Sequence, residues 1–340
     1  RSVGSYNYDY SNNTNAPRYF YDVYELANPE APKFASRFEV PANVANYGWG
    51  RFAVGGCTMD MGWGWYGGGE IAELTDGNLV VSQHAEPITG SGGNRVKYYL
   101  DRIDVSDPYH PVMLPKVNIP GSAIHFDSAT NQLVTIDYQE TTEAASSWED
   151  CYGRGYFGYG DYNDFQDCKV TRRSLNALRI EGERAVRTDQ VQLDRDKRTN
   201  NIAVSSNRIF YTTGDFPSYF YGISGVDSSG TAGQPIEMLP VTLETLRIGD
   251  GALNRLPPQQ LRSMRAGSYY YSTLYARDER VFEIFDSNVT VIDTLDPDNV
   301  QRVTRELPGW GCSSLEVSGD AAYCAVGQRG VEVIDLSGMR

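Results

Sequence analysis

Histidine is scarce in this chain of 340 residues, which has 3 histidines beside 34 glycines and 24 tyrosines. The three, His84, His110 and His125, lie in different sequence units, so no histidine cluster suggests itself for catalysis or metal binding. The sequence also has no Gly-x-Ser-x-Gly motif, no Cys-x-x-Cys pair and no Cys/His set with zinc spacing. These gaps argue against a serine hydrolase and against a structural zinc site.

Long apolar runs and excess positive charge are missing as well. No stretch of about 18 apolar residues occurs, which argues against a transmembrane helix. The chain has 44 acidic and 30 basic residues and a formal net charge of -14, so neither nucleic acid nor an anionic membrane surface is expected as a partner. A hydrophobic content of 40% argues against disorder.

Helical periodicity is almost absent, and short β-branched and aromatic runs separated by turn residues indicate an all-β fold. The best helical stretch, residues 243–265, is irregular and is broken by Pro257 and Pro258. Several tight hairpins are predicted, because Asp-Gly, Ser-Gly and Asn supply the positive φ angles that such turns need. They cover residues 71–82, 124–137, 202–212, 269–285 and 315–326.

A second unit alternates with the hairpins: an apolar strand, an Asp-Pro or Asn-Pro turn, and another strand. It begins at residues 23–26, 103–105 and 291–293, and a shortened copy begins at residue 333. A hairpin and the following unit make four antiparallel strands, which is one blade of a β-propeller. We therefore expect a propeller of five to seven blades, with long insertions near residues 138–168, 213–235 and 244–266 on one face. A β-sandwich would suit the short strands but would not explain the repeated Asp-Pro unit.

Two stretches resemble the LVIVD repeat, namely residues 315–323 with 330–337, and residues 103–108 with Pro111 and residues 119–121. The similarity extends over residues 286–337, 97–121 and 19–41, while the middle of the chain departs from the repeat. The resemblance implies a β-propeller in an exported or cell-surface protein, mostly of bacteria. It carries no catalytic residues that could be transferred to this chain.

The five cysteines favour an oxidising compartment. Cys151 and Cys168 bracket a Gly/Tyr/Asp loop, and Cys312 and Cys324 lie symmetrically about the turn at Gly319, so each pair could form a disulfide. Cys57 is then left free or paired outside the chain, and reduced thiols in a cytosolic protein are the alternative. We expect an N-terminal flexible segment over residues 1–18 and one propeller domain over residues 19–340. Because the chain starts at Arg1 and stops just after an apolar strand, we also expect a removed leader or a longer parent protein.

An acidic loop offers a candidate metal site. Oxygen ligands at Asp161, Asn163, Asp164 and Asp167 could surround Ca²⁺, although the loop lacks the central Gly and terminal Glu of an EF-hand. A solvated loop held by a disulfide is the alternative. No other cofactor is expected.

Two aromatic insertions are candidates for a recognition surface, because Tyr and Gly combine large contact area with an adaptable backbone. Their candidate binding residues are Trp148, Tyr152, Tyr156, Tyr159, Phe216, Tyr219 and Tyr221. The alternative is that these rings cover their own blades. The sequence thus predicts an exported, non-catalytic binding or assembly module at the cell surface, with protein or polysaccharide as its partner. A secreted hydrolase or lyase with a central-channel site, and a structural subunit of a larger surface assembly, are the alternatives.

Overall fold

The computed structural model describes residues 2–3, 19–25, 27–28, 30–40, 73–75, 78–87, 96–144, 168–194, 197–205, 207–214, 238–265, 272–277, 279–285, 287–296, 299–307, 312 and 314–338. Within these ranges the chain is all-β, as the sequence predicted, and a single 3-10 turn, η2 (Gly327–Arg329), is the one helical element. No helix there has the length and apolar character needed to cross a membrane.

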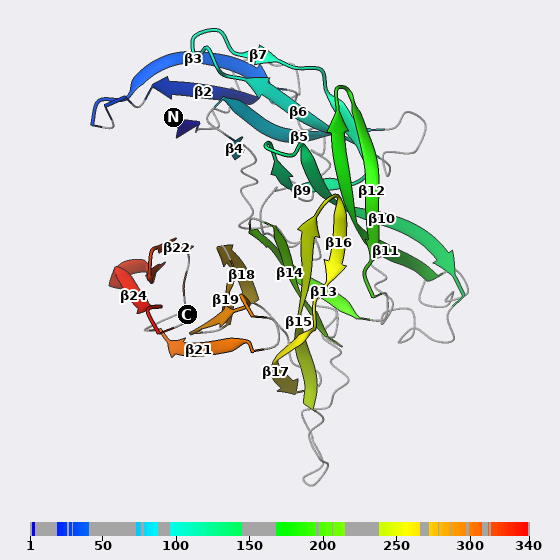
Figure 1. Cartoon of the computed structure of the whole chain (residues 1–340), viewed down its shortest axis with the longest axis vertical. Coiled ribbons are helices and arrows are strands. Elements are labelled where there is room, and N and C mark those ends of the chain that lie inside the picture. Colours follow the sequence, from blue (N-terminus) through cyan, green and yellow to red (C-terminus); the bar gives the residue numbers. More distant parts are fainter. Residues whose placement is uncertain are drawn as a thin grey trace. The chain divides into compact units, whose positions relative to one another are not determined.

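The chain divides into two compact units (Figure 1). Unit 1 comprises Arg1–Gly55, Gly62–Asp137 and Leu175–Gln190. Unit 2 comprises Gly56–Met61, Tyr138–Ser174 and Val191–Arg340. Three of the boundaries fall inside strands, namely β10 (Gln132–Glu143), β11 (Cys168–Glu181) and β12 (Arg184–Gln192).

Unit 1 holds sheet A and most of sheet B, whose strands β10, β11 and β12 continue into unit 2. Sheet A has the order β1 (Ser2–Val3), β2 (Tyr19–Glu25) and β3 (Lys33–Val40). Sheet B runs β4-β5-β6-β8-β12-β11-β10-β9, with β7 paired to β6. Its strands are β4 (Glu73–Thr75), β5 (Leu79–Pro87), β6 (Val96–Asp104), β7 (Val112–Met113), β8 (Val117–Ile119), β9 (Ser122–Asp127), β10 (Gln132–Glu143), β11 (Cys168–Glu181) and β12 (Arg184–Gln192). The parallel pairing of β8 with β12 therefore joins two consecutive runs, β4–β8 and β9–β12.

Strands β5 and β6 of unit 1 are covered on both faces. Because side chains alternate along a strand, neighbouring residues point to opposite sides. Val80 packs with Tyr21 of sheet A, whereas Val81 packs with Leu133 of the β9–β12 run. Burial of each such side chain contributes about 1.5–3 kcal/mol to folding.

Unit 2 holds three sheets. Sheet C has the order β13-β14-β15-β16, with β17 also paired to β15; sheet D has the order β18-β19-β20-β21, and sheet E the order β22-β23-β24. The strands of sheet C are β13 (Arg198–Ser205), β14 (Arg208–Gly214), β15 (Met238–Gly249), β16 (Ala252–Arg255) and β17 (Gln259–Arg265). Sheet D contains β18 (Ser272–Arg277), β19 (Arg280–Phe285), β20 (Asn288–Asp293) and β21 (Gln301–Glu306). Sheet E contains β22 (Ser314–Ser318), β23 (Ala321–Ala325) and β24 (Val331–Asp335).

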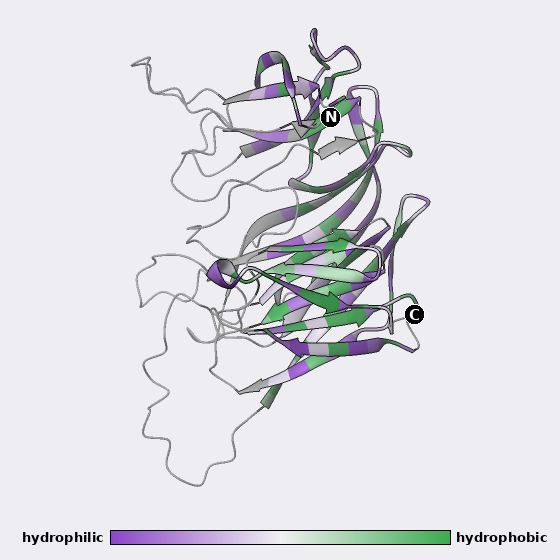
Figure 2. Cartoon of the chain, turned by 90° about the vertical axis from the view of Figure 1, so that its left-hand side faces the viewer, coloured by the Kyte–Doolittle hydropathy of each residue, from purple (hydrophilic) through white to green (hydrophobic). Residues whose placement is uncertain are grey.

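The sheets of unit 2 stack face to face in the order of the sequence. Val281 of β19 packs with Leu243 of sheet C, and its neighbour Phe282 packs with Ile334 of sheet E. Sheet D is therefore buried on both faces. Figure 2 shows hydrophobic stretches, coloured green, along many of the strands.

The Asp of the repeated unit has a definite structural role. In three copies its Oδ1 accepts a hydrogen bond from the backbone N–H two residues later, which starts the turn after the strand. The distances are 2.9 Å for Asp104 to Ser106, for Asp293 to Leu295 and for Asp335 to Ser337. The sequence repeat thus corresponds to a repeated local structure.

All five predicted hairpins are confirmed, as β4–β5, β9–β10, β13–β14, β18–β19 and β22–β23. The predicted insertion over residues 244–266 is wrong, because β16 and β17 both pair with β15 there. Asp250 and Gly251, with φ of 50° and 78°, close a two-residue hairpin that the prolines downstream had obscured. The other two predicted insertions, residues 138–168 and 213–235, lie mostly outside the described residues.

Candidate functional site

A cluster of charged side chains lies on one face of strands β5 and β6 in unit 1. His84 and Glu86 are two residues apart on β5, and Tyr99 and Asp101 are two residues apart on β6. The register pairs His84 with Tyr99, so all four side chains project from the same face of the sheet. Lys116, just before β8, completes the cluster, which we call the His84 network.

Both ring nitrogens of His84 meet carboxylates. Nδ1 lies 2.5 Å from Oδ2 of Asp101, and Nε2 lies 3.3 Å from Oε1 of Glu86. A carboxylate can only accept a hydrogen bond, so each ring nitrogen that faces one must carry a proton and donate. This geometry therefore favours the imidazolium, which has two N–H donors. The His84 ring is stacked on Tyr99 with centroids 5.1 Å apart.

Lys116 adds a second cation to the network. It donates to Oε1 of Glu86, and its Nζ lies 4.2 Å from the centroid of the Tyr99 ring. Two cations therefore face two carboxylates, and the charges balance when His84 is protonated. Charge balance is needed here because His84 and Asp101 are only 3% and 2% exposed, and a buried charge without a partner is destabilising.

The electrostatics of the network follow from these contacts. Burial of His84 is the largest influence on its pKa and lowers it, but the hydrogen bonds and charges of Asp101 and Glu86 outweigh burial and raise the pKa above its usual value. The hydrogen bond from Lys116 leads the influences that lower the pKa of Glu86, and the same bond raises the pKa of Lys116. The network can hold a proton and join three strands, but both nitrogens of His84 are already engaged.

His125 shows the opposite behaviour. It lies on β9, and burial lowers the pKa of its ring, with the charge of Asp127 opposing that effect. The neutral ring is thus the favoured form of His125, in contrast to His84.

Arginine side chains tie neighbouring elements together through backbone carbonyls. Arg208 of sheet C donates to the carbonyl of Thr294 after sheet D, and Arg302 of sheet D donates back to the carbonyls of Leu261 and Gln260 on β17, at 2.8 and 2.7 Å. Further links of this kind are Arg102 to Gly182, Arg173 to Thr199 and Arg255 to Gln192. Hydrogen bonds from a charged donor are stronger than neutral ones, so these links stabilise the stacking.

One buried ion pair joins sheets C and D. Arg262 of β17 is paired with Glu283 of β19. The Glu283 side chain is 0% exposed and that of Arg262 is 20% exposed. The guanidinium also lies over the ring of Phe285, 4.0 Å from its centroid.

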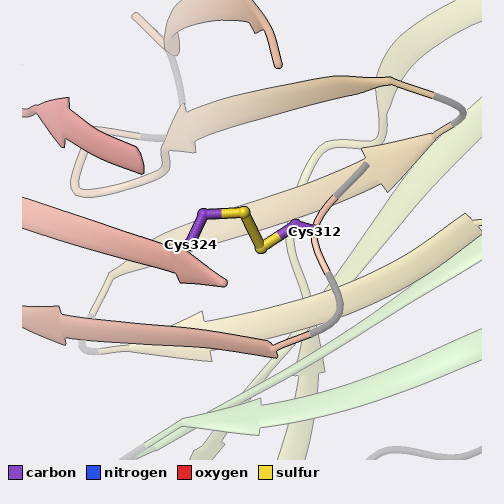
Figure 3. Close-up of a disulfide and its surroundings, with 2 residues drawn as sticks. All are labelled: Cys312 and Cys324. Carbon is purple, nitrogen blue, oxygen red and sulfur yellow. A yellow bond between two sulfur atoms is a disulfide. The ribbon is translucent and has the colours of Figure 1, made fainter. Parts of the chain in front are cut away.

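A disulfide fastens sheet E. Figure 3 shows the bond between Cys324, on β23, and Cys312, which precedes β22. Their Sγ atoms are 2.15 Å apart and their Cα atoms 5.5 Å, the pairing that their symmetric positions about Gly319 suggested. Cys324 is fully buried and packs against sheet D.

The other predicted site residues lie outside what the structure describes. These are the calcium candidates Asp161, Asn163, Asp164 and Asp167, the aromatic candidates Trp148, Tyr152, Tyr156, Tyr159, Phe216, Tyr219 and Tyr221, and the cysteines Cys57 and Cys151. For Cys168 only the backbone, at the start of β11, is described. Among the described residues, no group of three or more His, Cys, Asp or Glu side chains could hold a metal ion.

The His84 network was missed at the level of sequence, where the histidines looked isolated. A signal was present, because two ionisable residues stand two apart on each of two consecutive strands, β5 and β6. The register needed to align them was not apparent from the sequence.

Comparison of the chain with models of protein families and with curated proteins found no match.

Proposed function

We propose that the chain is an exported β-propeller that binds protein or polysaccharide at the cell surface and performs no catalysis itself. The binding surface is formed by the aromatic insertions that contain Tyr152 and Tyr219. The propeller itself is part of this proposal, with five to seven blades and LVIVD-type repeats.

The face-to-face stacking of consecutive sheets supports the propeller. Successive antiparallel runs, β2–β3, β4–β8, β9–β12, β13–β17, β18–β21 and β22–β24, follow one another along the chain. Within unit 2, the middle sheet is buried by its sequence neighbours on both faces. A propeller places every blade between the blades before and after it in this way.

The observation that supports the binding function is that charged side chains of the sheets form hydrogen bonds within the fold. The arginines described above donate to backbone carbonyls of neighbouring elements, and both nitrogens of His84 face carboxylates. These groups stiffen a scaffold, and a rigid scaffold that displays loops is a common basis for recognition. The Cys312–Cys324 disulfide supports an oxidising, exported location.

The test is to measure binding of the purified chain to an array of bacterial surface polysaccharides, and to cross-link the chain to intact cells that carry it. Two triple variants remove the aromatic rings, one with serine at residues 152, 156 and 159, the other with serine at residues 216, 219 and 221. Tyr109→Ser is the control, because Tyr109 is an exposed tyrosine of the described surface. We expect at least one triple variant to bind about tenfold more weakly or worse, and the control to bind as the parent does.

Binding that survives both triple variants would contradict the loop proposal. Turnover of a bound polysaccharide, seen as new reducing or unsaturated ends, would favour the hydrolase or lyase instead. Accumulation of the protein in the cytosol with Cys312 and Cys324 reduced would contradict export.

A further inference from the structure

Strand β24 forms an open edge of sheet E. Strand β24 pairs with β23 on one side, and no described strand pairs with it on the other. Its sequence, Val-Glu-Val-Ile-Asp, has strong β propensity and contains neither proline nor lysine, the residues that usually protect a sheet edge.

The hydrogen bonds of sheet E show which peptide groups point to the open edge. The N–H of Leu336 donates to the carbonyl of Asp320, and the N–H of Val326 donates to the carbonyl of Gly330. In an antiparallel ladder every second residue of a strand forms backbone hydrogen bonds to the same neighbouring strand. Residues 330, 332, 334 and 336 therefore bond inward, to β23. The N–H and C=O groups of residues 331, 333 and 335 therefore face outward.

Sheet D shows how the equivalent edge is filled. There the N–H of Thr294 donates to Glu279 as that of Leu336 does to Asp320, so β20 corresponds to β24 residue by residue. The outward peptide groups of β20 are taken by β21, Gln301–Glu306. That strand combines two β-branched residues, Val303 and Thr304, with two basic residues, Arg302 and Arg305.

The outer face of sheet E is exposed, whereas the equivalent face of sheet D is buried. Val289 and Val291 of β20 are 0% exposed because they pack in the core that sheets D and E share, whereas the equivalent Val331 and Val333 are 60% and 59% exposed. Tyr323, opposite Val333, is also exposed. On this face the three strands carry two carboxylates, Glu316 and Asp335, and no basic residue.

We propose that the open edge of β24 binds an antiparallel β-strand of another polypeptide, one that combines β-branched residues with arginine or lysine as β21 does. Strand addition to a sheet edge is an established mode of peptide recognition, in which the main chain supplies affinity and the side chains supply selectivity. The carboxylates of the outer face favour a basic strand. This site is separate from the aromatic insertions, so the proposal goes beyond the binding function above and stands independently of it.

The test uses the full chain and a fluorescent peptide with the sequence of residues 299–308, which contains β21. Anisotropy gives the affinity, and amide hydrogen exchange gives the site. We expect the peptide to slow exchange at the amides of Val331, Val333 and Asp335 by about tenfold or more. Exchange at Glu332, which bonds inward, should change little. A peptide N-methylated at the positions of Val303 and Arg305 should not bind.

Two variants of the chain locate the peptide independently. Val333→Pro removes an outward N–H and leaves the inward ladder intact, and Val333→Ala keeps that N–H. We expect the proline variant to bind the peptide about tenfold more weakly or worse, and the alanine variant to stay within about threefold of the parent. Circular dichroism verifies that each variant is folded, and the exchange measurement on the parent protein needs no variant.

Absence of exchange protection at Val331 and Val333 with saturating peptide would overturn the proposal. So would equal affinity for the N-methylated peptide. A third result would also overturn it: the chain forms dimers, Val333→Pro abolishes these dimers, and the peptide does not disrupt them. The occupant of the edge would then be a second copy of the chain.

Discussion

The ion pair between Arg262 and Glu283 leads to a sharp stability prediction. The pair joins sheets C and D, and the carboxylate is fully buried while the guanidinium is 20% exposed. We consider Arg262→Met, because methionine keeps a flexible apolar stem against Phe285 while it removes the charge and the hydrogen bond to Glu283.

The expected cost follows from the carboxylate that remains. Removing one partner from a buried pair typically destabilises a protein by about 3–5 kcal/mol, because the other charge stays buried without it. Since Arg262 is partly exposed, the lower end applies, and we expect the free energy of unfolding to fall by about 3 kcal/mol. Glu283→Met should cost about 1–2 kcal/mol, because the remaining arginine can turn toward water.

The double variant, with Arg262→Met and Glu283→Met together, measures the interaction energy between the two side chains. Two methionines fill the site without a buried charge, so the loss in the double variant should be smaller than the sum of the single losses by about 2 kcal/mol or more. The assay is urea unfolding of the full chain at neutral pH, with linear extrapolation to water. Arg187→Met, at an exposed arginine of β12, should stay within about 0.5 kcal/mol of the parent. Additive losses, or a loss below about 1 kcal/mol for Arg262→Met, would show that the two side chains do not stabilise each other.

Three further predictions address single features. Replacing Cys324 by alanine should lower the free energy of unfolding by about 3 kcal/mol in urea, because the 12-residue separation closes a short loop; an unchanged midpoint under oxidising conditions would contradict this. The raised pKa of His84 means that its stabilisation is complete below its usual pKa of about 6.5 and is lost as pH rises through the higher folded value. His84→Gln should therefore cost more stability near about pH 6 than near about pH 9, and an equal loss at both would sink the assignment. Gly121→Ala should impair folding, because a Cβ there would lie 2.1 Å from the carbonyl oxygen of Ile136 at a φ of +72°, whereas Gly182→Ala has open space; thermal melting of the two variants distinguishes steric clash from backbone strain alone.

Much of the fold was predictable because it depends on local chemistry. Turn residues such as Gly319, with its φ of +59°, specify hairpins over a few residues. The Asp of the repeated unit starts a turn through its own side chain, as Asp293 does toward Leu295. Such signals need no information from distant parts of the chain.

The region of residues 244–266 was misread because two signals conflicted. Pro257 and Pro258 suggested a break, whereas Leu246 and Ile248, two residues apart and both buried, follow the period of a strand. In the structure the prolines stand between β16 and β17, where neither strand needs their N–H groups.

The His84 network could not be predicted because it depends on register. His84 is opposite Tyr99 and next to Asp101 only in the pairing that the structure adopts. A slip of one residue would move Asp101 to the other face of the sheet. The hydrophobic residues on both faces of β5 set that register through contacts with distant segments, and these contacts leave no local mark in the sequence.

The most direct test of the proposed propeller is a high-resolution density map of the oxidised, purified chain. We expect consecutive four-stranded blades around a common axis, with the insertions of residues 138–168 and 213–235 on one face of the ring. Sheets arranged as a two-layer sandwich, or a cluster of carboxylates and histidines converging on the axis around a bound ligand, would contradict the binding-module account.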